Sequence, residues 1–136
     1  IDLSNEGLES ELIYEGQNQK FSTFTTFSKS KTEKGVSQQR RPDLNYGANF
    51  SKKFINSAVG PFNMNLNYKF TGKHLDYDGE ATVAKSTKIV DVIFSKDLFG
   101  SIWNLSITNL LNEKYERPLT YTKDGRRLTI GLRKSY

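Results

Sequence analysis

The chain has 136 residues, of which 35% are hydrophobic and 26% charged, and it contains no cysteine and a single histidine, His74. This composition is typical of a folded chain and excludes disulfide frameworks, thiolate metal sites and a cysteine nucleophile. The net charge of +5 comes from dispersed basic residues, not from a basic patch interleaved with aromatics, so we expect no nucleic-acid partner. No apolar run approaches the ~18 residues of a membrane helix, but strands of a β-barrel are apolar only at alternate positions.

Seven segments alternate between apolar and polar residues, whereas helical periodicity is almost absent. In chain order they cover residues 8–14, 21–27, 44–51, 62–71, 89–94, 103–108 and 128–133. The clearest alternation is in 62–71, where one face holds Phe62, Met64, Leu66, Tyr68 and Phe70 and the other holds Asn63, Asn65, Asn67, Lys69 and Thr71. We predict an all-β, antiparallel up-and-down meander of about seven long strands. The apolar faces of the other six segments hold Leu8, Leu12 and Tyr14; Phe21, Thr23, Thr25 and Phe27; Leu44, Tyr46, Ala48 and Phe50; Val90, Val92 and Phe94; Trp103, Leu105 and Ile107; and Leu128, Ile130 and Leu132.

The predicted connections alternate strictly between short and long. Residues 15–19, 55–61 and 95–101 form short connections, and residues 28–41, 72–85 and 109–125 form long ones. In an antiparallel meander every second connection lies at the same end, so all the long loops are expected together. This asymmetry is typical of an outer-membrane barrel, which has short periplasmic turns and longer extracellular loops.

The alternation alone leaves two architectures open. Strands of roughly 9 to 11 tilted residues cross a bilayer, and the polar face would then meet water or a polar plug. A soluble ligand-binding or adhesive β-sandwich, with its apolar faces packed together, has the same alternation. Glu9 and Glu11 share a strand face without a base or nucleophile beside them, so we interpret them as part of a polar wall and expect no enzyme.

The C-terminal residues contain a recognisable motif. Asn109-Leu110-Leu111-Asn112-Glu113-Lys114-Tyr115 follows the sixth segment, and Gly125-Arg126 precedes the last one, which runs to the terminal aromatic Tyr136. This stretch resembles the C-terminal end of TonB-dependent outer-membrane receptors, with Asn109, Leu110, Asn112, Tyr115 and Gly125 at the motif positions. Lys134 departs from the family by placing a lysine at an outward position, from which its ammonium group can snorkel to the interface.

Two upstream stretches narrow the resemblance. Arg40-Arg41-Pro42 precedes a strand, and Tyr68-Lys69-Phe70-Thr71-Gly72 leads into Asp76-Tyr77-Asp78. Both are similar to stretches of the vitamin B12 (cobalamin) receptors within the family. Iron-siderophore receptors share much of the C-terminal motif and are the alternative.

The resemblance implies an integral barrel of about 22 strands in the outer membrane of a Gram-negative bacterium, with these seven strands as the last. The implied partners are outer-membrane lipid and lipopolysaccharide, the protein's own plug domain and upstream strands, the TonB complex through an N-terminal part, the barrel-assembly machinery, which reads Tyr136, and a small-molecule nutrient. No cofactor is implied. An odd number of strands and a start at Ile1 without a methionine lead us to expect a part of a larger barrel.

The external loops contain the candidate ligand contacts, which are Arg40, Arg41, Asp76, Tyr77, Asp78, Tyr121 and Arg126. The two guanidinium groups at 40 and 41 offer fork-shaped donors to a carboxylate or phosphate. The alternative for both is a solvated charge that pairs with lipopolysaccharide phosphate or nearby acids. Asp76 and Asp78 have a spacing found in calcium loops, but the rest of that loop pattern is absent, so we predict no metal site.

Overall fold

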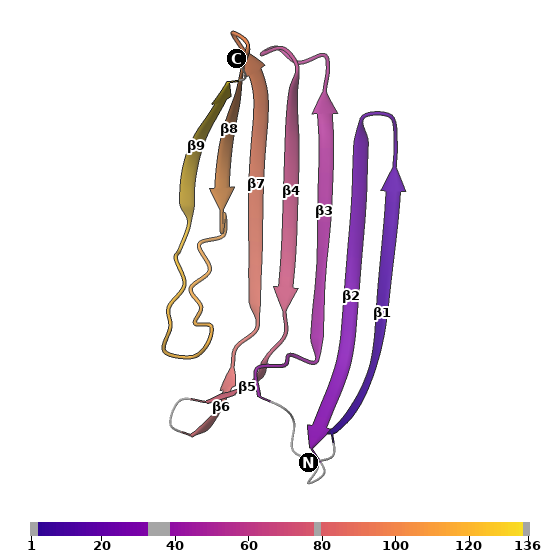
Figure 1. The fold of residues 1–136 in the computed structure, drawn as a ribbon, viewed down its shortest axis with the longest axis vertical. Helices are drawn as coiled ribbons and strands as arrows, with labels where there is room; N and C mark the ends of the chain where they lie inside the picture. Colours follow the sequence, from indigo (N-terminus) through magenta and orange to yellow (C-terminus); the bar gives the residue numbers. More distant parts are fainter. Residues whose placement is uncertain (1–2, 33–38, 78–79, 135–136) are drawn as a thin grey trace.

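The computed structural model describes residues 3–32, 39–77 and 80–134, and the structural statements below refer to these residues. They form one seven-stranded antiparallel sheet and a separate two-stranded hairpin, without a helix (Figure 1). The predicted all-β antiparallel meander is therefore confirmed. In spatial order the sheet consists of β1 (Leu3–Glu15), β2 (Gln19–Thr32), β3 (Leu44–Phe54), β4 (Phe62–Thr71), β7 (Thr87–Leu98), β8 (Ser101–Thr108) and β9 (Arg127–Lys134).

Some strands are longer than predicted, because their backbone pairing continues past the residues that alternate between apolar and polar. β1 and β2 pair along their whole length, from Leu3 opposite Thr32 to Glu15 opposite Lys20, so β2 occupies part of the predicted connection 28–41. Residues 28–32 are serine, lysine and threonine only, and ladder hydrogen bonds form without regard to side-chain polarity. The predicted connection 72–85 contains the hairpin of β5 (His74–Tyr77) and β6 (Ala81–Ala84).

The connection between β7 and β8 is also tighter than predicted. It consists of Phe99 and Gly100 alone, with φ angles of 55° and 68°, between the paired residues Leu98 and Ser101. Positive φ at both central residues is typical of a type I′ turn, whose twist matches that of the two strands it joins. The tight turn leaves β7 twelve residues long.

The strand register places the predicted apolar residues on one face of the sheet. Cross-strand partners lie on the same face, and the pairs across its centre include Leu66 with Val92 and Leu105 with both Phe94 and Ile130. Aromatic rings stack near both ends of this face. Tyr46 stacks on Phe70 and Phe54 on Phe62, with ring centroids 4.6 Å apart in each pair.

No second layer of the described residues covers this apolar face. Leu8 is 70% exposed and Ile130 67%, and the buried hydrophobic residues are Ala84 and Val92. The accessible surface is 10093 Å², whereas a compact monomer of 15.5 kDa would expose about 7,200 Å². The described residues thus form a single-layer sheet, and their second sheet, the β5–β6 hairpin, lies at its loop end and not over its apolar face (Figure 1).

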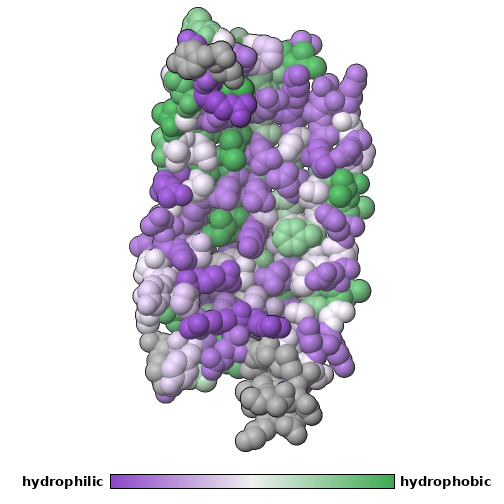
Figure 2. All heavy atoms as spheres, viewed as in Figure 1, coloured by the Kyte–Doolittle hydropathy of each residue, from purple (hydrophilic) through white to green (hydrophobic). Residues whose placement is uncertain are grey.

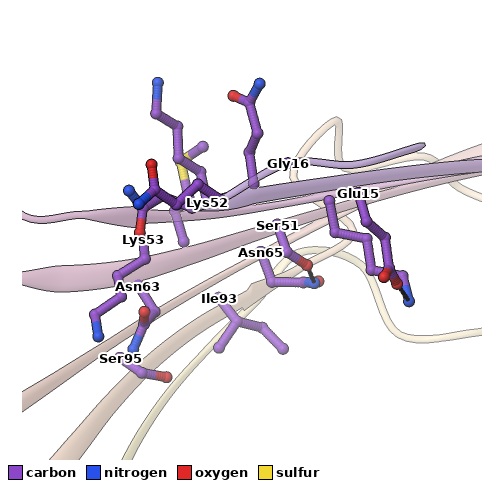
Figure 3. A pocket seen from close by; sticks show the side chains of 14 residues that line it. Glu15, Gly16, Ser51, Lys52, Lys53, Asn63, Asn65, Ile93 and Ser95 are labelled. Carbon is purple, nitrogen blue, oxygen red and sulfur yellow. Dashed lines mark hydrogen bonds and ion pairs between the residues drawn. The ribbon is translucent and has the colours of Figure 1, made fainter.

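The opposite face is mostly polar (Figure 2), although Ile13, Phe24 and Ile93 also lie on it. Its polar side chains bond to one another across the strands. Asn65 donates to Ser51 Oγ at 2.7 Å and exchanges longer hydrogen bonds with Asn49, while Ser95 donates to Asn104 Oδ1 at 2.6 Å. Near the tight turns Ser51, Asn65 and Ser95 line an open hollow of about 450 Å³, together with Lys53 (Figure 3). The polar face is therefore hydrogen-bonded within itself yet remains open to water.

Candidate functional site

The three long connections lie together at one end of the sheet, and the tight turns lie at the other (Figure 1). The first long connection joins β2 to β3, the second contains the β5–β6 hairpin, and the third joins β8 to β9 across residues 109–126. This placement follows from the antiparallel meander, in which alternate connections share an end. The candidate ligand contacts predicted from sequence belong to these connections.

Asp76 holds the three long connections together. Its side chain is 1% exposed, and its two carboxylate oxygens accept hydrogen bonds from Arg40 Nε at 2.8 Å and from the Leu119 amide at 2.9 Å. The amide of Tyr77 also donates to Oδ1, at 2.8 Å. Arg40 belongs to the first connection, Asp76 to the second and Leu119 to the third, so one buried carboxylate links all of them.

The backbone places Arg40 for this role. Its φ angle is 60°, in the left-handed region, and its amide donates to the Leu75 carbonyl oxygen at 2.6 Å. Its Nε therefore faces the β5–β6 hairpin, although much of the side chain remains exposed to solvent. Arg40 thus pairs with a neighbouring acid. This is the alternative to a ligand contact that was considered for Arg40 from the sequence.

The same hydrogen bonds shift the titration of Asp76. The bond from Arg40 and then the bond from the Leu119 amide lower the pKa of Asp76 from 3.8 to about 2. Because the folded pKa lies below the unfolded one, the link stabilises the loops above about pH 4 and is lost as the pH falls through about 2.

We expect Arg40→Gln to raise the pKa of Asp76, because the substitution removes the strongest donor and its charge. A carboxyl ¹³C NMR titration of Asp76 measures the midpoint directly. Arg41→Gln is the matched control, since the neighbouring Arg41 is exposed and makes no bond to Asp76 among those described. An unchanged midpoint in the Arg40 variant would show that this hydrogen bond does not hold the carboxylate.

Two asparagines of the C-terminal motif shape the third connection. Asn109 is buried, and its side chain donates to the Glu113 carbonyl oxygen at 2.9 Å and accepts from the Glu113 amide at 2.8 Å. Its own amide donates to Asp91 Oδ1 on β7 at 2.8 Å. Asn112 Oδ1 accepts from the Arg126 amide at 2.9 Å, just before β9 begins. The motif residues therefore close the base of the loop onto the sheet.

Gly125 and Leu110 complete this closure. A Cβ atom on Gly125 would lie 2.7 Å from Asn112 Oδ1, so a larger residue would push away the oxygen that accepts from Arg126. The Leu110 amide donates to the Val90 carbonyl oxygen of β7 at 2.7 Å. The motif thus has a structural function in this chain, because it positions the loop and the start of β9.

A cavity of about 520 Å³ lies between the β6 end of the hairpin and the third connection. Its lining includes charges of both signs, an aromatic ring and an apolar side chain, from Val83, Lys85, Glu113, Lys114, Tyr115 and Glu116. Small-molecule sites have volumes of about 300–1,000 Å³ and combine apolar walls with a few polar groups. The cavity therefore has the size and chemistry to take part of a polar organic ligand.

The structure brings together only some of the residues predicted for this site. Arg40 and Asp76 meet, whereas Tyr77, Tyr121, Arg41 and Arg126 are exposed separately at the loop end. Of the predicted residues, Tyr115 alone lines the cavity among those described. Glu113 and Lys114 also line it and lie within the C-terminal motif stretch, but they were not among the residues predicted for the site. Asp78 and Tyr136 lie outside the described residues.

Comparisons with known proteins found no protein-family model that matches the chain and no curated protein with significant sequence similarity. Within the described ranges, no helix is long and apolar enough to cross a membrane. Among those same residues, no group of three or more histidine, cysteine, aspartate or glutamate side chains is placed to hold a metal ion.

Proposed function

We propose that this chain forms the C-terminal part of the wall of a TonB-dependent outer-membrane receptor, which takes up a scarce small-molecule nutrient of the cobalamin type. The observation that supports this proposal best is the single-layer sheet, whose apolar face has no second layer of the described residues over it while its other face is mostly polar. In water such a face is costly, at about 25 cal/mol for each Å² of apolar surface left exposed. In a bilayer the same face would be in contact with lipid.

The height of the apolar face fits a membrane. On β7 it extends from Lys88 to Lys96, with Val90, Val92 and Phe94 between them. Eight residues at about 3.4 Å each span about 27 Å, or about 20 Å across a bilayer when the strand tilts by about 40°. The apolar band of outer-membrane barrels is about 25 Å tall, and lysine stems extend several ångströms farther to reach the headgroups.

The unpaired edges of the sheet are evidence that the strands belong to a larger barrel. β1 pairs only with β2 and β9 only with β8 among the described strands, so each outer strand has one unpaired side. In hydrocarbon every unpaired backbone group costs several kcal/mol, and only a closed barrel removes the edges. Upstream strands of the same receptor would pair with both edges, and a plug would fill the polar side.

The loop end supplies the features of a ligand mouth. Asp76 fixes the three loops relative to one another, and the cavity beside them contains Lys85, Lys114 and Glu116. Tyr77 and Tyr121 are exposed nearby, and a tyrosine ring buries a large area at a low entropic cost on binding. A polar organic nutrient would contact the mouth through these rings and through the charged groups of the cavity.

Equilibrium binding of labelled cobalamin to outer membranes that contain the full-length protein tests the ligand. We expect saturable cobalamin binding, and we expect Tyr121→Ala to weaken it by about fivefold, a modest loss for an interface aromatic. Phe99→Ala is the matched control, because Phe99 is also an exposed aromatic residue, at 98% against 67% for Tyr121, but lies in a tight turn at the opposite end. Binding of a ferric siderophore without binding of cobalamin would replace the cobalamin proposal with the siderophore alternative.

A further inference from the structure

A groove of about 430 Å³ crosses the apolar face at the tight-turn end of the sheet. Its walls are almost entirely apolar and include Phe62, Phe94, Trp103, Leu105 and Ile130, from four different strands, while Lys96 lies at its rim. An apolar trough beside a single cationic group has the form that an amphiphile would fill. A flat lipid-facing wall would need no such groove.

Lys96 is placed to present its charge to the groove. The side chain is half-buried, and its Nζ lies 3.5 Å from the position that a Cβ on Gly60 would occupy, over the turn between β3 and β4. No Asp or Glu forms a salt bridge with Lys96 among the described residues. The neighbouring acid, Asp97, lies on the polar face opposite Ile102. The ammonium group is thus held at the groove without a carboxylate from this face.

Two more lysines lie on the same face at this end. Lys52 pairs with Met64 and so lies level with Phe94 of β7, and its Nζ is 5.1 Å from the centroid of the Phe54 ring. Lys134 pairs with Ser101 and so lies level with Leu98. Measured along β7, Lys52 thus lies level with residue 94, Lys96 at residue 96 and Lys134 level with residue 98. Each lysine is therefore two residues nearer the turns than the one before it. An oblique line of this kind marks one depth in a barrel whose strands tilt.

We propose that the groove and its lysine line bind an anionic phospholipid from the leaflet at the tight-turn end. One acyl chain lies along Phe62, Phe94 and Trp103, and the phosphate of the headgroup lies at Lys96 with Lys52 and Lys134 on either side. Charge complementarity selects this occupant, because each lysine near a membrane surface favours anionic lipid by about fivefold. The inference rests on the proposed function, since it requires that this face contact lipid.

Quenching of Trp103 fluorescence by brominated acyl chains tests the proposal, because Trp103 lies in the groove wall. The full-length protein is inserted into phosphatidylcholine vesicles that contain equal fractions of brominated phosphatidylglycerol or brominated phosphatidylcholine. The signal of Trp103 is isolated by subtracting that of the Trp103→Phe variant. We expect the anionic lipid to quench Trp103 with an apparent affinity about threefold to fivefold higher than that of the zwitterionic lipid.

Lys96→Met keeps an unbranched apolar side chain of similar length and removes the charge, so we expect it to bring the two affinities close to equal. Lys88→Met is the matched control, since Lys88 lies on the same face of the same strand at the other end and should leave the preference unchanged. Equal quenching by both lipids in the unmodified protein would overturn the phospholipid site while leaving the membrane proposal intact. Quenching by neither lipid would overturn both, because Trp103 would then not contact acyl chains.

Discussion

Replacing Ile130 with arginine is expected to lower the free energy of unfolding in a bilayer by about 2–4 kcal/mol. Ile130 is 67% exposed on the apolar face and pairs with Leu105, four residues from Lys134 along β9. In the proposed orientation it lies near the bilayer midplane, where a guanidinium group has neither water nor a partner. Unfolding by urea in phosphatidylcholine vesicles, followed by tryptophan fluorescence, measures the loss.

Thr129→Arg is the matched control for this substitution. Thr129 precedes Ile130 on the same strand but pairs with Ser106 on the polar face, so its arginine would face water and change the stability little. If both variants unfolded at the same urea concentration, the apolar face would not contact lipid. If the unmodified chain stayed folded and monomeric in buffer without detergent, the membrane proposal would fail.

Replacing Asn109 with alanine is expected to destabilise the protein by about 1–3 kcal/mol. The side chain is buried and accepts a hydrogen bond from the Glu113 amide, so alanine would leave that amide without this partner. Asn109 also has a φ angle of 52°, which asparagine tolerates better than alanine does. The urea midpoint of the full-length protein in detergent measures the change, and cleavage in residues 110–126 by a low concentration of protease reports the opening of the loop.

Asn67→Ala is the control, because Asn67 is an exposed asparagine on the polar face of β4, opposite Asp91. Its removal should leave the midpoint and the cleavage rate of the loop nearly unchanged. Equal effects of the two substitutions would show that Asn109 has no special function in closing the loop. A slower cleavage of the Asn109→Ala loop would contradict the closure described above.

The strands could be predicted because one side of each is apolar. In Phe62–Thr71 every second side chain is apolar, and the structure pairs Leu66 with Phe50 on one side and Val92 on the other. A one-residue shift in register would turn these residues to the polar face, so the alternation determines both the strand and its register. The alternation of short and long connections likewise predicted the placement of the loops at one end.

The contacts within the loops could not be predicted in the same way. Arg40 and Asp76 were singled out separately, and no spacing in the sequence showed that Leu119 would donate to the same carboxylate. The β5–β6 hairpin was also missed, because four-residue strands are too short to show a reliable alternation. The cavity beside the hairpin has its walls on two connections that are separate in the sequence.

The sequence by itself determined the all-β class, the two faces of the sheet and the end at which the long loops lie. These properties follow from local periodicity, since side chains on a strand alternate between faces whatever the rest of the chain does. The tertiary structure alone decided that Asp76 links three loops, that the C-terminal asparagines close the last loop onto β7, and that Lys96 borders an apolar groove. Each of these depends on residues that are distant in the sequence, and only the paired strands bring them together.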